Sequence, residues 1–378
     1  MKIIILTLPL HVNYGGILQV YALQTILTDI GHEVVVTDWP TFISLPPKPQ
    51  RWFVYLRRYL GKVLHGSDSE VRWEYRQNQR IAMERRHTQP FINTHINRYV
   101  ISGPREIDCG DIDAVIVGSD QVWRLRYFCS LWNAGIEDAF LGFTEGKKLK
   151  RIAYAASFGS EVWEMNKEQT ENCRRLLSKF DAVSVRESSG IQLCKDYLKR
   201  DNVERMADPT FLLDKEHYIK KFHVTNFPRS HGTMMCYVLD NDTRSKERIL
   251  KIEKSLGLKS FKVNSEVENK EADKQNRIQP PVEQWLRGFL DAELVITDSF
   301  HACVFSILFN KPFYVIGNAE RGLSRIESLL SIMNLRQCII SDYNNLPADI
   351  PDINWKEVNS IVAKERETGW SFIRENLK

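Results

Sequence analysis

The sequence has no pair of cysteines at CxxC spacing, and its seven cysteines are scattered over 378 residues. An odd number of scattered cysteines argues against a disulfide framework and is typical of reduced thiols in the cytoplasm. No Cys or His pair has the short spacing of structural zinc sites, so we expect no metal. No apolar run approaches the ~20 residues that span a bilayer. The apolar start, residues 1–7, lacks a small-residue cleavage site and predicts a strand rather than a signal peptide.

Net charge is small, only +4, because 52 Lys and Arg nearly balance 48 Asp and Glu, but one segment is strongly basic. Residues 48–105 hold twelve Lys or Arg and four Asp or Glu, a net charge of +8, with Trp52, Phe53, Tyr55 and Tyr59 interleaved. Such a segment favours an anionic partner, either a lipid-linked acceptor or the inner membrane surface as a peripheral contact. The alternative is a pair of solvated helices that form a homo-oligomer or cover a sheet edge. No nucleic-acid-binding module is recognisable, so we expect no nucleic acid partner.

Alternating strand and helix patterns predict an α/β fold of two facing Rossmann-like doubly wound domains, with parallel sheets. The predicted strands are 3–6, 33–37, 114–117, 152–156, 182–185 and 203–206, then 233–239, 260–263, 294–297 and 313–316. Helices are predicted at 17–30, 167–180, 189–199, 243–255, 282–290 and 300–309, with a final helix at 355–376. We therefore predict an N-terminal domain over 1–225, with a basic helical insertion at about 41–105. A C-terminal domain follows over 226–345, and 346–378 forms a helix that packs back on the first domain.

Ligands of open parallel sheets bind outside the carboxyl ends of the strands. That rule selects five loops here, at residues 13–16, 118–123, 157–160, 186–189 and 298–302. The first four belong to the first domain and the last to the second. A site built from both sets must face a cleft between the domains.

Two of these loops are suited to an acceptor. The loop of Asn13, Tyr14, Gly15 and Gly16 lacks the GxGxxG dinucleotide spacing, but its glycines permit close backbone approach and the following helix offers free N–H groups. Its alternative is a plain tight turn. Ser119, Asp120 and Trp123 combine polar groups with an aromatic ring, as sugar sites do. The alternative is that Ser119 or Asp120 only caps a helix.

The segment 297–301 (TDSFH) is the strongest candidate for catalysis. It ends a strand and begins an apolar helix, so Asp298 or Ser299 is expected to cap the helix and His301 to stand in its first turn. Arg186 ends another strand, where it can bind a carboxylate or phosphate bidentately or pair with Glu187. Arg321 and Arg325 can reach a phosphate from the second domain, or lie solvated on its surface.

Five motifs occur in the order found in one family: 13–24 (NYGGILQVYALQ), 118–123 (GSDQVW), 185–187 (VRE), 208–210 (DPT) and 297–301 (TDSFH). In this combination the chain resembles the bacterial polysaccharide pyruvyl transferases, over residues 1–40 and about 113–335. That family is similar in fold to GT-B glycosyltransferases. The resemblance says nothing about residues 41–105.

The resemblance implies a transferase that moves pyruvate from phosphoenolpyruvate to a sugar of a polysaccharide repeat unit, as in capsule biosynthesis. The product is a cyclic ketal, phosphate is released, and no cofactor is needed. The acceptor is expected on a lipid diphosphate at the inner membrane face. The first domain would bind it through residues 13–16, Ser119, Asp120 and Trp123. The second would bind the donor.

The resemblance also implies which residues catalyse the reaction and which bind the donor. Catalysis is assigned to His301 and Asp298, with His301 as the general acid that protonates phosphoenolpyruvate. Donor binding is assigned to Arg186, Ser299, Phe300, Arg321 and Arg325. Two other functions remain open: a GT-B glycosyltransferase that uses a nucleotide sugar, and a carbohydrate-binding assembly component without turnover.

Overall fold

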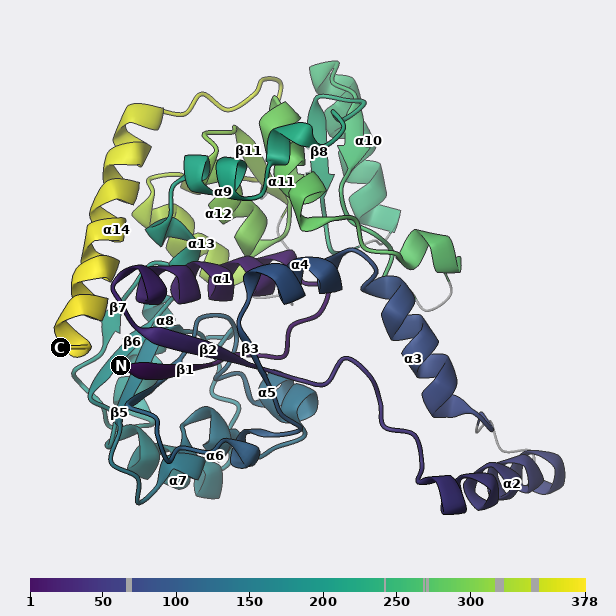
Figure 1. Cartoon of the computed structure of the whole chain (residues 1–378). Helices are drawn as coiled ribbons and strands as arrows, with labels where there is room; N and C mark the ends of the chain where they lie inside the picture. The colour runs from purple at the N-terminus through teal and green to yellow at the C-terminus, as the bar shows by residue number, and fades with distance from the viewer. Residues whose placement is uncertain (66–69, 241–242, 268, 270–271, 317–322, 341–346) are drawn as a thin grey trace.

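Two parallel β-sheets, each flanked by helices, form the body of the molecule (Figure 1). The computed structural model describes residues 1–65, 70–240, 243–267, 269, 272–316, 323–340 and 347–378. Both sheets are parallel throughout, as short strand–helix–strand repeats require. The fold class predicted from the sequence is therefore confirmed.

The first sheet has the strand order β3-β2-β1-β4-β5-β6-β7, a Rossmann-type order that reverses between β1 and β4. Its strands are β1 (Lys2–Leu6), β2 (Glu33–Asp38), β3 (Arg98–Val100), β4 (Ala114–Val117), β5 (Lys150–Ala156), β6 (Ala182–Val185) and β7 (Glu204–Arg205). Alternate side chains of β1 enter two different cores, Ile3 and Ile5 on one face and Ile4 and Leu6 on the other.

The second sheet has the order β12-β11-β10-β8-β9, which reverses between β8 and β10. Its strands are β8 (Met234–Tyr237), β9 (Ser260–Lys262), β10 (Leu294–Thr297), β11 (Phe313–Ile316) and β12 (Ile339–Ile340). The two reversal points are the places where a doubly wound sheet leaves room for a ligand. Both border the same cleft, described below.

Helices cover both faces of each sheet. Those of the first domain are α1 (Tyr14–Asp29), α4 (Thr88–His95), α5 (Leu125–Trp132), α6 (Ile136–Ala139), α7 (Lys167–Leu177) and α8 (Ser188–Asp196). Those beside the second sheet are α9 (Lys215–Lys221), α10 (Thr243–Leu256), α11 (Val282–Asp291), α12 (Phe300–Leu308) and α13 (Leu323–Ile332). Although α9 precedes the predicted boundary at residue 225, its Tyr218 packs on Phe305 of α12. The short 3₁₀ turns η3 (Pro209–Leu212) and η5 (Lys274–Arg277) lie between them. One continuous apolar core joins α1 of the first domain to α11 and α12 of the second.

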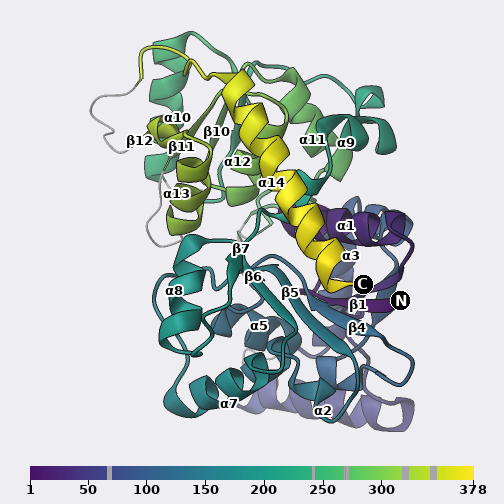
Figure 2. The ribbon, with the colours of Figure 1, turned by 90° about the vertical axis from the view of Figure 1, so that its left-hand side faces the viewer.

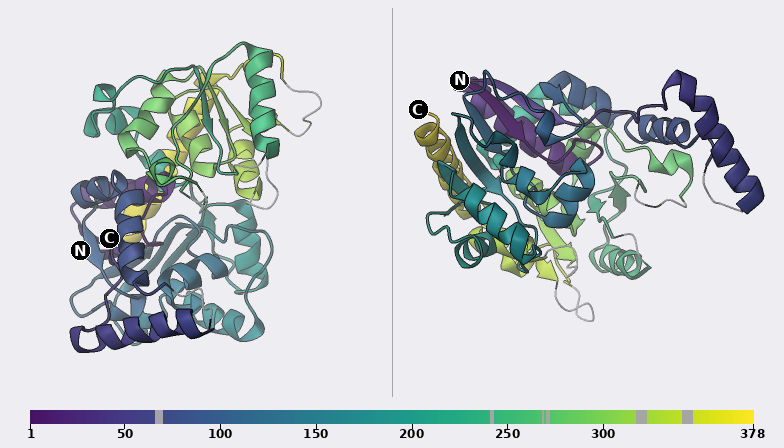
Figure 3. Two further views of the ribbon diagram at one scale, coloured as in Figure 1. Left: turned by 90° about the vertical axis from the view of Figure 1, so that its right-hand side faces the viewer. Right: turned by 90° about the horizontal axis from the view of Figure 1, so that it is seen from below.

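Two helices leave this body and form an arm, α2 (Lys48–His65) and α3 (Trp73–Glu84) (Figures 1 and 3). The predicted insertion ended near residue 105, and the structure ends the arm earlier. Phe91 and Ile92 of α4 are buried in the main core, and β3 pairs with β2 at the edge of the first sheet. The arm therefore consists of α2 and α3, whereas α4 and β3 belong to the first domain.

The last helix, α14 (Trp355–Asn376), runs along both domains (Figure 2). Near its start, the Asn334 side chain donates a hydrogen bond to Glu357 from the second domain. Further along, Arg366 donates to the carbonyl oxygens of Phe211 and Leu213. At its end, Lys150 of β5 donates to the carbonyl of Asn376. The helix thus ties the two domains together.

Candidate functional site

A cleft of about 1250 Å³ lies between the carboxyl ends of the two sheets. The loop after β1 and Asp120 after β4 line it from the first domain. Val238, Leu239 and Asp240 after β8 and Ser299 after β10 line it from the second. These are the two points at which strand order reverses. Of the residues predicted from the sequence, Asn13, Gly16, Asp120 and Ser299 lie on the cleft wall.

His301 contacts the first domain directly. It stands in the first turn of α12, and its Nε2 lies 3.4 Å from Oδ2 of Asp208, which follows β7. The alignment is not that of a hydrogen bond, and Nε2 has no hydrogen-bond partner among the described residues. The contact is strongly attractive only while the ring carries a proton. His301 is 7% exposed and is not among the residues that line the cleft, although Ser299, two residues earlier, is.

Gly15 makes this approach of the two domains possible. A Cβ atom at position 15 would overlap the His301 ring. The first glycine of the Gly15–Gly16 pair therefore serves close packing of the catalytic candidate against α1, rather than a ligand. The second, Gly16, donates its N–H to Oδ1 of Asn13, which caps α1.

Asp208 is the hub of the site, and sequence reasoning gave it no role. Its Oδ2 accepts hydrogen bonds from Ser119 Oγ at 3.0 Å and from an Arg186 guanidinium nitrogen at 2.9 Å. Its Oδ1 accepts from the N–H and hydroxyl of Thr210. Burial alone would raise the pKa of this carboxyl, but His301, Arg186 and Thr210 together lower the pKa well below its ordinary value. The only sequence signal was its place in the segment 208–210.

Arg186 and Arg325 form a cationic pair around one aromatic ring. The Arg186 guanidinium lies 4.3 Å from the centre of the Phe300 ring, and that of Arg325 lies 5.9 Å from it. Burial, followed by the charge of Arg186, lowers the pKa of Arg325 to about 10. Within the described chain, two nitrogens of Arg186, Nε and one terminal amine, have no hydrogen-bond partner. Arg321 lies outside the described residues.

The alternative role of Arg186, a pair with Glu187, is present only as a long contact, and both side chains are buried rather than on the surface. Nε of Arg186 and the Glu187 carboxylate are 4.0 Å apart. Glu187 instead accepts hydrogen bonds from the Ser157 hydroxyl and the N–H groups of Phe158 and Gly159. It thereby fixes the turn after β5 and leaves Arg186 for other partners.

Asp298 does not cap α12, contrary to expectation. Its two oxygens accept hydrogen bonds from the N–H groups of Leu239 and Asp240, at 2.8 and 2.9 Å. Ser299 occupies the cap position, but its side chain makes no capping hydrogen bond. Asp298 therefore holds the loop after β8, which is part of the cleft wall, and its catalytic role stays a prediction.

Two residues that were predicted to bind the acceptor, Tyr14 and Trp123, are buried and cannot contact a sugar in this structure. Trp123 is 1% exposed, stacks on Phe140 and donates its indole N–H to the Ala139 carbonyl, so its ring offers no plate to a sugar. Tyr14 is fully buried and its hydroxyl donates to the carbonyl of Pro280 in the second domain. Both are packing residues. Ser119 is also buried, against Asp208.

His11, from the loop after β1, also lines the cleft. Burial, with the Arg85 charge, lowers the pKa of His11 to about 4, although the Asp120 charge opposes the shift. The ring is therefore neutral near pH 7, beside a carboxylate. Asp120 has a φ of 72°, a strained left-handed conformation that a functional contact can justify. Their proximity was not visible in the sequence, because His11 lies five residues beyond the strand end.

Neither a metal cluster nor a membrane-spanning helix occurs in the described part of the chain. No group of three or more His, Cys, Asp or Glu side chains there could hold a metal ion. No helix there is long and apolar enough to cross a bilayer. All seven cysteines are free thiols.

A family model described as polysaccharide pyruvyl transferase matches residues 13–320. No curated protein matches the chain. Among solved structures, Arabidopsis thaliana UGT89C1 complexed with UDP-L-rhamnose is similar at 10% identity and a TM-score of 0.46, covering 100% of this chain and 97% of that one. The spinosyn rhamnosyltransferase SpnG complexed with thymidine diphosphate has 11% identity and a TM-score of 0.43, with both chains covered completely. An uncharacterized protein of Klebsiella pneumoniae, KP1_0663, has 13% identity and a TM-score of 0.39, covering 70% and 88%.

Proposed function

The chain belongs to the polysaccharide pyruvyl transferase family, and we propose that it transfers pyruvate from phosphoenolpyruvate to a sugar on a lipid diphosphate. The product would be a cyclic ketal, with release of phosphate. One observation supports the donor most directly. Arg186, from the first domain, and Arg325, from the second, meet at Phe300 beside His301.

The proposed donor suits these cations. Phosphoenolpyruvate carries a phosphate and a carboxylate, and guanidinium groups bind both with paired hydrogen bonds. Two Arg186 nitrogens have no hydrogen-bond partner among the described residues. The cavity beside Arg186, Asp208 and Phe300 measures only about 10 Å³. Entry of a phosphate therefore requires movement between the domains at this point.

The chemistry we propose begins at His301. Its protonated ring gives a proton to the methylene carbon of the donor, which forms a C–H bond and leaves an oxocarbenium centre. A sugar hydroxyl adds to that centre, and a second hydroxyl displaces phosphate and closes the ketal. The Asp208 carboxylate, 3.4 Å from Nε2, steadies the charged ring before the transfer. The arginines balance the charge of the departing phosphate.

The large cleft is proposed to hold the acceptor sugar. Asp120 and the neutral His11 ring face it and can accept protons from the two hydroxyls as they react. Asn13 adds a polar side chain to the same wall. The first domain thereby acts mainly on the acceptor, and α12 with α13 of the second acts mainly on the donor.

The test is phosphate release from phosphoenolpyruvate with lipid-linked sugars, together with mass detection of the ketal. We expect Arg186→Ala to raise the donor KM about tenfold or more, since a charge-assisted contact is worth about 1.5–3 kcal/mol. Arg174→Ala, on the outer surface of α7, is the matched control and should leave donor KM unchanged. His301→Ala should lower kcat by about 10²–10⁴-fold. Normal turnover by His301→Ala, or phosphate release only from a nucleotide sugar, would refute the proposal.

A further inference from the structure

The outer face of α2 is a continuous apolar stripe exposed to solvent. Its positions recur at helical spacing, so they share one side of the helix. They are Trp52, Phe53, Leu56, Tyr59, Leu60, Val63 and Leu64, each between 43% and 68% exposed. In the described structure no other element covers them, and the arm that carries them stands away from the body (Figure 3).

The charges of α2 are all of one sign. Its eighteen residues include Lys48, Arg51, Arg57, Arg58 and Lys62 and no Asp or Glu. Arg58 turns inward and forms a bidentate pair with Glu74 of α3, at 2.7 and 2.8 Å. At 100° per residue, Lys48 and Arg57 fall on the two borders of the apolar stripe. Their long side chains can therefore extend outward beside it.

We propose that α2 lies flat on an anionic lipid surface, with its apolar stripe among the acyl chains and its basic borders at the headgroups. An apolar face bordered by Lys and Arg, with Trp and Phe, is the composition of helices that bind in the plane of the interface. Each basic residue near an anionic surface adds to the binding. A second copy of α2 fits this face poorly, because it would bring two acid-free, positively charged helices together.

The arm holds α2 in a fixed place relative to the cleft. One end of α3 is held to α2 by the Arg58–Glu74 pair, and the other is held to the second domain by the buried Glu84–Arg277 pair. Arg80 and Glu84 at that inner end line the cleft. The twelve residues of α3 span about 18 Å. A helix on the membrane thus keeps the cleft near the bilayer, which, given the proposed function, is where a lipid-linked acceptor resides.

The experiment is sedimentation of the full chain with vesicles of phosphatidylcholine alone or with phosphatidylglycerol, in low and in 0.5 M salt. We expect binding only to the anionic vesicles, and its loss in high salt. The triple variant Leu56→Gln, Leu60→Gln, Leu64→Gln should bind these vesicles at least about tenfold more weakly than the wild type. Its matched control replaces exposed apolar residues elsewhere, Val162→Gln, Leu250→Gln and Ile350→Gln, and should bind as the wild type does.

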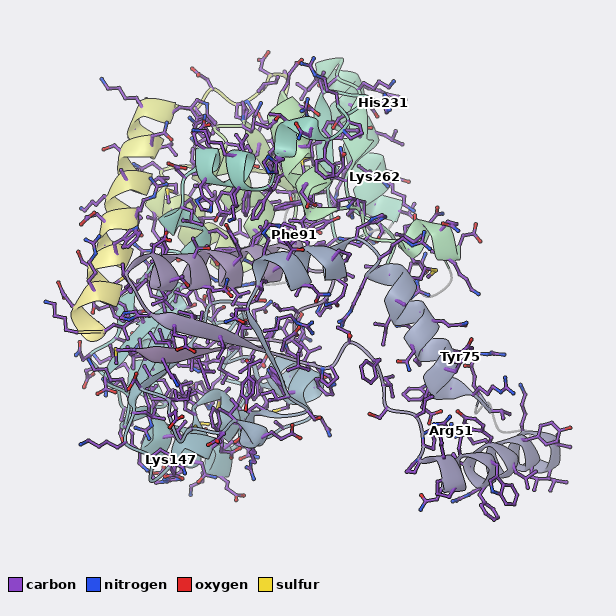
Figure 4. All side chains as sticks on the ribbon, viewed as in Figure 1. Arg51, Tyr75, Phe91, Lys147, His231 and Lys262 are labelled. Carbon is purple, nitrogen blue, oxygen red and sulfur yellow. The ribbon has the colours of Figure 1, made fainter. Side chains whose placement is uncertain are left out.

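A second pair of variants changes charge alone. Arg57→Gln with Lys62→Gln should weaken binding about tenfold. The control is Lys147→Gln with Lys148→Gln, which should not weaken it; Lys147 lies far from the arm (Figure 4). Equal binding to neutral and anionic vesicles, or none to either, would overturn the proposal. The proposal would also be overturned if the wild type sedimented as a dimer and the leucine variant as a monomer. Phosphate release with a soluble sugar acceptor should be unchanged in the α2 variants, so this test is independent of the proposed reaction.

Discussion

At the scale of single residues, one carboxylate, that of Asp208, contacts side chains of both domains. Asp208 binds Ser119, Arg186 and Thr210 within the first domain and faces His301 of the second. All of these groups are buried, so the interactions are only weakly screened by solvent. The arrangement stabilises the fold and also sets the position of the histidine, and these two effects can be separated by experiment.

Replacing Asp208 by Asn should destabilise the protein by about 3–5 kcal/mol, because it leaves a buried guanidinium without its charge partner. The pKa of Asp208 is lowered in the folded state. Its stabilising contribution is therefore complete at pH 7 and declines as the pH falls below about 4, the ordinary pKa of Asp. Melting temperatures of wild type and variant should differ most at pH 7 and converge in acid. Glu145→Gln, at an exposed ion pair, should show little difference at pH 7.

Gly15→Ala should displace the His301 ring, since the new methyl group would occupy its place. We expect kcat to fall by about 10²-fold through misplacement of the ring, with a stability loss of about 1–3 kcal/mol. Gly103→Ala is the control, because a Cβ there meets no atom within 4 Å. Unchanged kcat in Gly15→Ala would show that the position of His301 does not matter for turnover.

At the scale of elements, α1 acts as the contact between the domains. It is buried over most of its length, between the first sheet and the second domain. Its first residue, Tyr14, stacks on Trp285 at 5.2 Å and reaches the Pro280 carbonyl. The segment 13–16 is therefore an interdomain joint that also forms part of the cleft wall.

Tyr14→Phe should keep the stacking and lose the hydrogen bond to Pro280. The expected cost is about 1 kcal/mol or slightly more, since the Pro280 carbonyl loses its donor. A melting curve would measure it, with Tyr75→Phe as the control, because Tyr75 is 52% exposed on the arm (Figure 4). Equal melting temperatures in both variants would mean that the joint does not depend on this bond.

At the scale of the whole molecule, α14 limits how far the two domains can separate. It contacts the second domain near its start and the first domain over its later turns (Figure 2). The space beside Arg186 is too small for a phosphate, so the proposed donor binding there would require some opening. Under that proposal, the attachment of α14 to both domains would affect donor entry as well as stability.

Arg366→Ala should loosen that fastening, because two carbonyl oxygens lose a charged donor. We expect the free energy of unfolding to fall by about 1–3 kcal/mol, which would lower the melting temperature. Lys364→Ala, on the exposed side of the same helix, should have no such effect. A stable Arg366→Ala protein would show that the apolar contacts of α14 suffice.

The sequence by itself determined the parallel two-sheet fold, the strands at 114–117, 182–185, 294–297 and 313–316, and the last helix, which match the structure in both bounds. These features follow from local apolar patterns and turn residues, which act over a few positions. It also placed Arg186 and Ser299 at strand ends, because the sheet edge is a topological consequence of parallel pairing. The helices α4, α5, α6, α9 and α13 and the short strands β3 and β12 were not predicted, since most of these elements are brief.

Only the tertiary structure decided which face of each loop the other domain covers. That choice buried Tyr14 and Trp123, which by type could serve a sugar, and brought His11 to the cleft. It also made Asp208 the partner of Ser119, 89 residues away, and of His301 in the other domain. A buried charge is stable only where its partners converge in space, and such convergence across two domains leaves no local pattern in the sequence.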